Sequence, residues 1–178
     1  MTWWSVGPVG ASRDLWVHVH GDGKPGRGRW VTPAGRDVLK VLRAEGPPGL
    51  DVAVHWVQQR DSRGKRPTAM LWQTDLSGFK LVSTDMVEVL RQHCPDLRTF
   101  PDLDIRLRNG ERVSGYVGVL EPFAVDAPVH SYFSDRRAHR LVVDDDVSRA
   151  LRSSDLAGLE ITEAPGPFPG DLYVDEDD

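Results

Sequence analysis

The chain has almost no cysteine. Cys94 is the only one among 178 residues, so an internal disulfide is excluded. No apolar run approaches the length needed to cross a bilayer, and the N-terminus lacks the charged, apolar and small-residue parts of a secretory signal. These absences predict a cytoplasmic protein without a membrane partner. In that reducing compartment we expect the Cys94 thiol to be buried and unreactive rather than a nucleophile.

The chain also lacks an excess of basic residues. Its 22 lysines and arginines are outnumbered by 27 aspartates and glutamates, which gives a formal net charge of −5. This balance argues against direct binding of nucleic acid and is compatible with a basic protein partner. The remaining composition, 39% hydrophobic and 28% charged, is typical of an ordinary globular protein.

What the chain does contain is a complete strand–helix–strand pattern at residues 129–162. Two β-rich patches precede the aspartates at 144–146, which can accept hydrogen bonds from the first N–H groups of a helix. An apolar stripe at i, i+3 and i+4 starts at Val147 and predicts a helix at 146–154. Gly158 ends the helical pattern, and a returning strand follows it.

A related pattern, Asp-x-x-x-x-Leu-Arg, begins at Asp37, Asp85 and Asp146. Duplication of one unit explains it, and so does convergence on the cap, apolar stripe and basic last turn that any short helix needs. Both explanations stay open. We predict an α+β fold in which short helices pack on mostly antiparallel sheet, built from strand–helix–strand units.

Local signals place several other elements. Pro33 is expected to begin a helix whose apolar stripe lies in 35–44, and Ser83 to cap another. Residues 97–107 are predicted to be extended, with edge or irregular pairing because they contain a proline. Asn109-Gly110 predicts a two-stranded hairpin.

The tryptophans suggest a division of the chain. All six lie at or before Trp72, and the segment 58–67 is polar and basic, as expected of a surface loop or junction. We therefore predict a Trp-rich α/β lobe at 1–66 and a second α/β lobe at 67–178 that ends in a disordered acidic tail. One continuous domain is the alternative, since 178 residues are one domain's worth of chain.

Candidate metal ligands are few. A predicted strand places His18 and His20 on one face, a spacing compatible with a metal, and Asp22 follows closely. A zinc or iron site needs a third convergent ligand, and His55 and Asp51 have no diagnostic spacing. We predict no metal, and we keep His18, His20 and Asp22 as the ligands of an alternative metal site.

The glycine-rich loop at 21–29 contains the G-x-G-x-x-G spacing of dinucleotide-binding loops. Here Pro25 and a basic loop replace the required helix, so we predict no cofactor. No serine has a nucleophile elbow around it, and we predict no catalytic residue. The alternative is a metal-dependent or small-ligand enzyme that uses His18, His20 and the 21–29 loop.

Structural signatures follow one another in a fixed order between residues 78 and 162. They are a strand with a serine-capped helix, an extended aromatic-proline segment, a hairpin with glycine and tyrosine, and a closing strand–helix–strand. Their residues are Leu81-Val82-Ser83 with Val89-Leu90, Phe100-Pro101, Gly110 with Gly115-Tyr116-Val117, and 141–161. This series resembles immunity protein family eleven of bacterial polymorphic toxin systems.

The resemblance implies a non-catalytic protein that binds and neutralises a cognate protein toxin, encoded by an adjacent gene. That role requires a rigid scaffold, well-packed anchor residues and complementary charge. We predict Trp3, Trp4 and Trp16 as anchors, and Asp144 and Asp145 as contacts for a basic toxin. A homo-oligomeric adaptor, for example a homodimer paired through exposed strand edges, is a further alternative.

Overall fold

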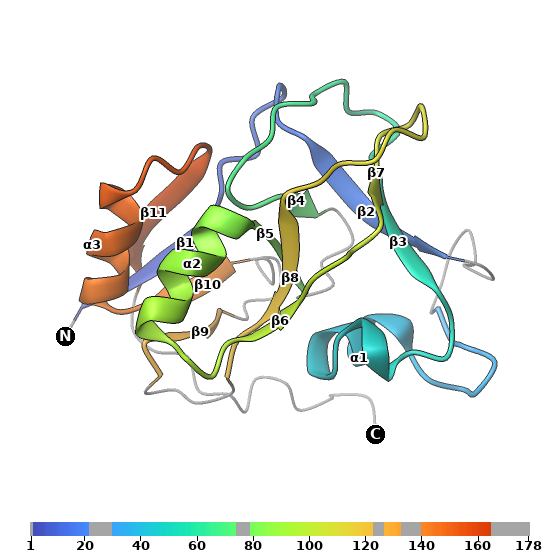
Figure 1. Ribbon diagram of the computed structural model, residues 1–178, viewed down its shortest axis with the longest axis horizontal. Helices are drawn as coiled ribbons and strands as arrows, with labels where there is room; N and C mark the ends of the chain where they lie inside the picture. Colours follow the sequence, from blue (N-terminus) through green and yellow to red (C-terminus); the bar gives the residue numbers. More distant parts are fainter. Residues whose placement is uncertain (1, 22–29, 74–78, 123–126, 133–139, 165–178) are drawn as a thin grey trace.

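The computed structural model describes residues 2–21, 30–73, 79–122, 127–132 and 140–164. These residues form three short α-helices, one 3-10 helix and eleven strands in three mostly antiparallel sheets (Figure 1). The predicted α+β fold is therefore confirmed. The helices are α1 (Val38–Ala44), η1 (Pro47–Gly49), α2 (Thr84–His93) and α3 (Asp145–Ser153).

Each sheet has its own strand order. We call them the first, second and middle sheets. The first and middle sheets are fully antiparallel, whereas the second has a central antiparallel pair and a parallel pair at each edge. In order, the first sheet is β11 (Leu159–Ala164), β1 (Trp3–Pro8), β10 (Arg140–Val143) and β9 (Val129–Tyr132). The second is β4 (Trp72–Gln73), β2 (Trp16–Gly21), β3 (Val54–Gln58) and β7 (Ile105–Arg106). The middle one is β5 (Lys80–Ser83), β8 (Tyr116–Leu120) and β6 (Arg98–Phe100).

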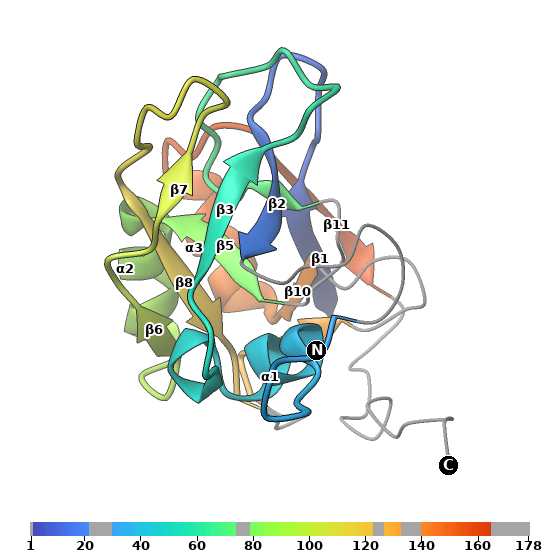
Figure 2. The same ribbon diagram turned by 90° about the vertical axis from the view of Figure 1, so that its right-hand side faces the viewer.

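The middle sheet separates two hydrophobic cores. Because side chains alternate between the faces of a strand, Val82 and Val119 enter one core while Leu81 and Leu120 enter the other. The first core lies under α2 and α3, and the second lies between the middle sheet, β2, β3 and α1. Figures 1 and 2 show α2 and α3 on the side of the molecule away from β2 and β3.

Local capping explains where α2 and α3 begin. The Ser83 hydroxyl accepts a hydrogen bond from the Met86 N–H at 3.2 Å, and the Asp144 carboxylate accepts one from the Val147 N–H at 2.9 Å. The predicted helix at 146–154 is thus confirmed within one residue. Each helix packs its apolar stripe into the first core, and α2 and α3 contact each other.

The Asp-x-x-x-x-Leu-Arg pattern does not mark the same position in the three helices. Asp37 is the N-cap of α1, whereas Asp85 and Asp146 lie inside the first turns of α2 and α3. The structure therefore does not confirm a threefold repeat. The units around α2 and α3 do share one topology, because each helix connects two parallel strands that flank a third strand, β8 or β1.

The expected start of the first helix is wrong. Gly35 has a φ of +81°, and its N–H donates to the Thr32 carbonyl in a turn. The helix begins only at Val38, where the Asp37 side chain accepts from the Lys40 N–H at 3.1 Å. Pro33 and Gly35 therefore belong to the turn before the helix, since a residue with positive φ cannot lie within a right-handed helix.

The sheets do not follow the predicted division at residue 66. The N-terminal strand β1 pairs with β10 and β11 in the first sheet, and β2 and β3 share the second sheet with β4 and β7. The segment 58–67 is also less exposed than expected of a junction. Gln58 and Ser62 are buried, and the Gln58 amide donates to the Gly64 carbonyl at 2.8 Å. The predicted disordered tail after Ala164 lies outside the described residues.

The Asn109-Gly110 turn is present, but its arms separate quickly. The Leu107 N–H donates to the Glu111 carbonyl at 2.8 Å, and one isolated bridge joins Arg106 to Arg112. Beyond that bridge β7 enters the second sheet and β8 enters the middle sheet. The predicted turn is present, but the strands on its two sides pair in different sheets and do not form an extended hairpin.

Two remaining expectations concern the cysteine and the membrane. Cys94 is buried at the end of α2, and this burial raises the pKa of its thiol, as expected of an unreactive cysteine. Among the described residues, no helix has both the length and the apolar character to span a bilayer.

Candidate functional site

The predicted anchors Trp3 and Trp4 make internal contacts. Trp3 is 8% exposed and meets the His130 ring edge-on, with centroids 4.8 Å apart. The Trp4 indole N–H donates to the Asp145 carboxylate at 2.8 Å, and the Arg152 guanidinium lies 4.8 Å from the Trp4 ring. The Trp4 contacts join β1 to α3, whereas Trp3 contacts β9.

The two predicted aspartates also serve the interior. Asp144 caps α3, and Asp145 accepts hydrogen bonds from the Trp4 indole and from the Thr2 N–H. The Trp4 hydrogen bond, followed by the Thr2 one, lowers the pKa of Asp145. The structure thus brings Trp4 and Asp145 into direct contact beside Asp144, where they position α3. Trp3 instead packs with Val142 and Ala164, apart from these contacts.

Trp16 lies elsewhere, on the second sheet. It is half-buried beside Trp72, with ring centroids 5.8 Å apart. With Ser12 and Ser62 it lines a pocket of about 280 Å³. The Trp16 indole N–H and the Ser62 hydroxyl are buried, and neither has a hydrogen-bond partner in the part of the chain that the structure describes.

Three histidines gather on the outward face of β2 and β3. His20 lies directly opposite His55, and His18 lies two residues before His20 on the same face. The ring centroids of His18 and His20 are 6.3 Å apart, and those of His20 and His55 are 5.1 Å apart. As they stand, no three His, Cys, Asp or Glu side chains of the described residues could hold a metal ion. Asp22 and the loop residues 22–29 lie outside those residues.

A buried polar cluster lies where the middle sheet meets the first sheet. The Lys80 ammonium and the Glu121 carboxylate form an ion pair of 2.5 Å, with side chains only 1% and 4% exposed. His130 is buried nearby, and its Nδ1 lies 3.2 Å from the Ala127 carbonyl oxygen. Burial lowers the pKa of His130, against smaller opposing effects of the Ala127 hydrogen bond and of Glu121.

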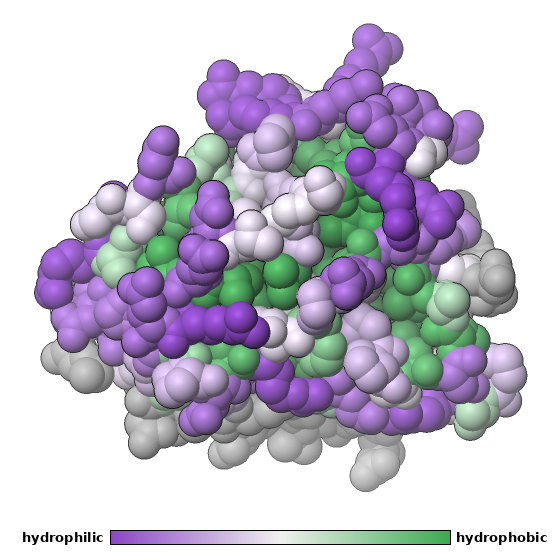
Figure 3. Space-filling model, viewed as in Figure 1, coloured by the Kyte–Doolittle hydropathy of each residue, from purple (hydrophilic) through white to green (hydrophobic). Residues whose placement is uncertain are grey.

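A groove of about 310 Å³ lies between η1, β3 and the segment that leads from β6 to β7. We call it the β3–β6 groove. Its lining is mostly apolar, aromatic or proline and includes two aspartates. The lining residues are Pro47, Pro48, Val54, Trp56, Thr99, Phe100, Pro101, Asp102, Leu103 and Asp104. In Figure 3, hydrophobic residues reach the surface in the region between β8 and β3, bordered by hydrophilic ones.

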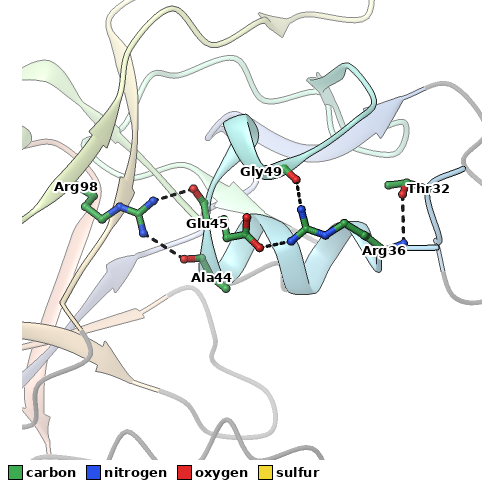
Figure 4. Close-up of polar contacts among 6 residues, drawn as sticks. All are labelled: Thr32, Arg36, Ala44, Glu45, Gly49 and Arg98. Atoms are coloured by element: carbon green, nitrogen blue, oxygen red, sulfur yellow. Dashed lines mark hydrogen bonds and ion pairs between the residues drawn. The ribbon is translucent and has the colours of Figure 1, made fainter. Parts of the chain in front are cut away.

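Arginine side chains fix one wall of this groove (Figure 4). Arg98 of β6 donates to the carbonyls of Ala44 and Glu45, at 3.2 and 2.9 Å, and so satisfies the end of α1. Arg36 donates to the Gly49 carbonyl and pairs with the Glu45 carboxylate. Together the two arginines hold α1, η1 and β6 in one arrangement.

A close backbone approach positions Phe100 in the groove. Gly46 has a φ of +78° and follows the end of α1, where glycine is favoured because it has no Cβ. A Cβ at this position would lie 2.5 Å from the Phe100 ring. The ring of Phe100 also contacts Phe79, which stacks on Trp56, so aromatic rings run from the groove into the second core.

The two aspartates of the groove differ in their partners. Asp104 is bound in bidentate fashion by Arg106, at 2.8 and 2.5 Å. Those hydrogen bonds, and then the charges of Arg106 and Arg112, lower its pKa. The exposed Asp102 carboxylate has no ion pair or hydrogen bond with any residue that the structure describes. Its backbone has a φ of +62°, which is uncommon for a residue other than glycine.

None of the groove residues was predicted from the sequence to be a site residue. The segment 97–107 was predicted to be extended, and the pair Pro47-Pro48 stands out in the sequence only as the end of a helix. An acidic residue directly after Phe100-Pro101 was the one available signal. The groove itself brings residues 47–56 together with residues 99–104, which are far away in the chain.

No family model matches this sequence, and no curated protein does.

Proposed function

We propose that this is a non-catalytic immunity protein of the cytoplasm that binds and neutralises a cognate bacterial toxin. The kind of function comes from the resemblance at residues 78–162. The observation that supports a binding role most directly is the β3–β6 groove, a mostly apolar depression whose lining includes the unpaired carboxylate of Asp102.

The groove has the physical properties that a protein partner uses. A bulky side chain of the toxin can bury apolar surface against Phe100 and the prolines, and central buried anchors provide most of the binding energy in protein complexes. Asp102 can pair with a basic residue of the toxin. The net charge of −5 would attract a basic toxin over longer distances and accelerate association.

The positive φ of Asp102 adds a structural argument. Such backbone conformations cost of order 1–3 kcal/mol and cluster at sites that bind ligands or partners. Here the conformation lies at an exposed position of the groove, between an edge strand of the middle sheet and an edge strand of the second sheet. We propose that it aims the carboxylate toward the partner.

The first experiment is co-expression with the protein encoded by the adjacent gene. We expect that protein to be toxic alone, to be harmless when this chain is present, and to co-purify with it one to one. A harmless neighbour and no tight partner in a pull-down would refute the proposal. A pull-down that yields only further copies of this chain would favour the homo-oligomeric adaptor.

The second experiment asks whether the groove is the binding surface. We expect Phe100→Ala to weaken toxin binding by a factor of ten or more, as the loss of an interface anchor does. Asp102→Asn keeps a residue that tolerates positive φ and removes only the charge, so it should slow association most strongly at low salt. Asp155→Asn, an exposed position after α3, is the matched control and should bind normally. Unchanged binding in both groove variants would place the interface elsewhere.

A further inference from the structure

The histidine face of β2 and β3 has a geometry that the proposed function does not use. His20 and His55 are register partners on antiparallel strands, so the strand pairing fixes their backbones side by side. His18 projects from the same face as His20, because residues two apart on a strand point the same way. The core lies behind this face, where Val19 and Trp56 are buried.

We propose that His18, His20 and His55 form a binding site for a divalent transition-metal ion such as Zn²⁺. Two imidazoles that bind one zinc at about 2.0–2.1 Å have ring centroids roughly 5 Å apart. The observed separation of His20 and His55, 5.1 Å, already matches this requirement. The His18 ring, 6.3 Å from that of His20, must turn toward the ion. As they stand, the three rings do not form a group that could hold an ion, so the proposal requires this movement of His18 on binding.

The chemistry of the ligands selects the class of ion. Imidazole nitrogen suits Zn²⁺, Cu²⁺ and Ni²⁺, whereas Mg²⁺ and Ca²⁺ prefer carboxylate, carbonyl and water oxygens. Three histidines leave the fourth position of a tetrahedral zinc open to water. The rings of His18 and His55 are half-buried and that of His20 is exposed, so an ion can reach the site from solvent. This inference does not rest on the toxin-binding role.

The test uses the full chain, purified without a histidine tag and stripped with a chelator that is then removed. Calorimetric titration with ZnCl₂ at pH 7.5 should show one ion per chain. Co²⁺ should give the visible absorption of a bound ion, and MgCl₂ should give no binding signal. We expect His20→Ala and His55→Ala each to weaken Zn²⁺ binding at least tenfold, because each removes one of the two rings whose separation already suits a shared ion. His18→Ala should weaken it less.

His93→Ala supplies the matched control, since His93 lies in the last turn of α2, away from the second sheet. It should bind Zn²⁺ like the unaltered protein. Circular dichroism checks that each variant is folded, and the Co²⁺ spectrum of the unaltered chain tests the site without any substitution. The absence of stoichiometric binding by the unaltered chain would overturn the inference. So would equal losses in His93→Ala and His20→Ala, or unchanged binding in His20→Ala and His55→Ala.

Discussion

The two larger hydrophobic cores of the described residues are built from different side chains, and the surfaces beside them differ. The buried residues of the first core are mainly aliphatic, and the amphipathic helices α2 and α3 cover them. The second core contains buried aromatic rings, including Trp30, Trp56 and Phe79, and only the seven-residue α1 packs on it. The groove, the Trp16 pocket and the histidine face all belong to the second core's side of the molecule.

The difference has a simple physical origin. Helices with regular apolar stripes fit closely on a sheet and leave few openings. Large planar rings bordered by turns and short strands pack less regularly, and the turns leave depressions at the surface. We infer that the first core supplies stability, while the second side of the molecule supplies the surfaces for binding.

The largest expected effect comes from the buried ion pair beside the first core. Lys80→Met should reduce the free energy of unfolding by about 3–5 kcal/mol, because it leaves the Glu121 carboxylate buried and uncompensated. The double substitution Lys80→Met/Glu121→Leu should recover most of that loss. Urea denaturation measures both. A single variant as stable as the parent would show that water or another group solvates Glu121.

A cavity in the first core should affect stability without affecting binding. Leu90→Ala removes a fully buried side chain of α2, so we expect a loss of about 2–5 kcal/mol in the free energy of unfolding. The affinities for toxin and for Zn²⁺, measured well below the melting temperature, should stay unchanged. A large loss of either affinity would mean that the two sides of the molecule are mechanically coupled.

A smaller effect is expected in the difference between two glycine variants, of which only one contacts Phe100. Gly46→Ala introduces both backbone strain and a clash with the Phe100 ring, whereas Gly35→Ala, at a similar positive φ, introduces the strain alone. The strain should cost about 1–2 kcal/mol in each variant. The clash should add about 1–3 kcal/mol to Gly46→Ala and weaken toxin binding by displacing Phe100. Equal unfolding free energies would contradict the role we assign to this contact.

The smallest expected effect is a pH dependence from His130. Burial lowers its pKa in the folded protein, so protonation favours the unfolded state. The free energy of unfolding is therefore not reduced by His130 above the unfolded-state pKa of about 6.5, and it decreases as pH falls from there through the lower folded-state pKa. His130→Asn should flatten the decline in melting temperature between pH 7 and pH 5. The lowered pKa of Asp145 affects stability in a separate pH range, because its stabilising effect is lost only as pH falls below the ordinary pKa of 3.8. An unchanged slope in the variant would mean that other groups cause the decline.

Caps and alternation were predictable because they depend on neighbouring residues. Ser83 and Asp144 accept hydrogen bonds from N–H groups only three positions along the chain. In β2 the buried Val17 and Val19 alternate with His18 and His20, as the sequence pattern predicts. The first helix was placed too early because an apolar stripe does not show where a preceding turn ends. Only the φ of Gly35 decides that.

The site was harder to predict, because tryptophan serves interiors as well as interfaces. Trp3 and Trp4 were predicted to be anchors, but both make internal contacts because β1 pairs with β10 and β11. The histidines show the opposite case. His55 had no diagnostic spacing relative to His20, and the register of β2 with β3 placed the two side by side.

The sequence by itself determined the fold class, the capped helices α2 and α3, and the alternating faces of the strands, since these follow from interactions within a few residues. Only the tertiary structure decided that β1 pairs between β10 and β11 in the first sheet. It also decided that Pro47, Trp56 and Phe100 line one groove, and that His55 lies beside His18 and His20. The reason is that such juxtapositions depend on which apolar faces bury each other, and many distant pairings satisfy the same local pattern.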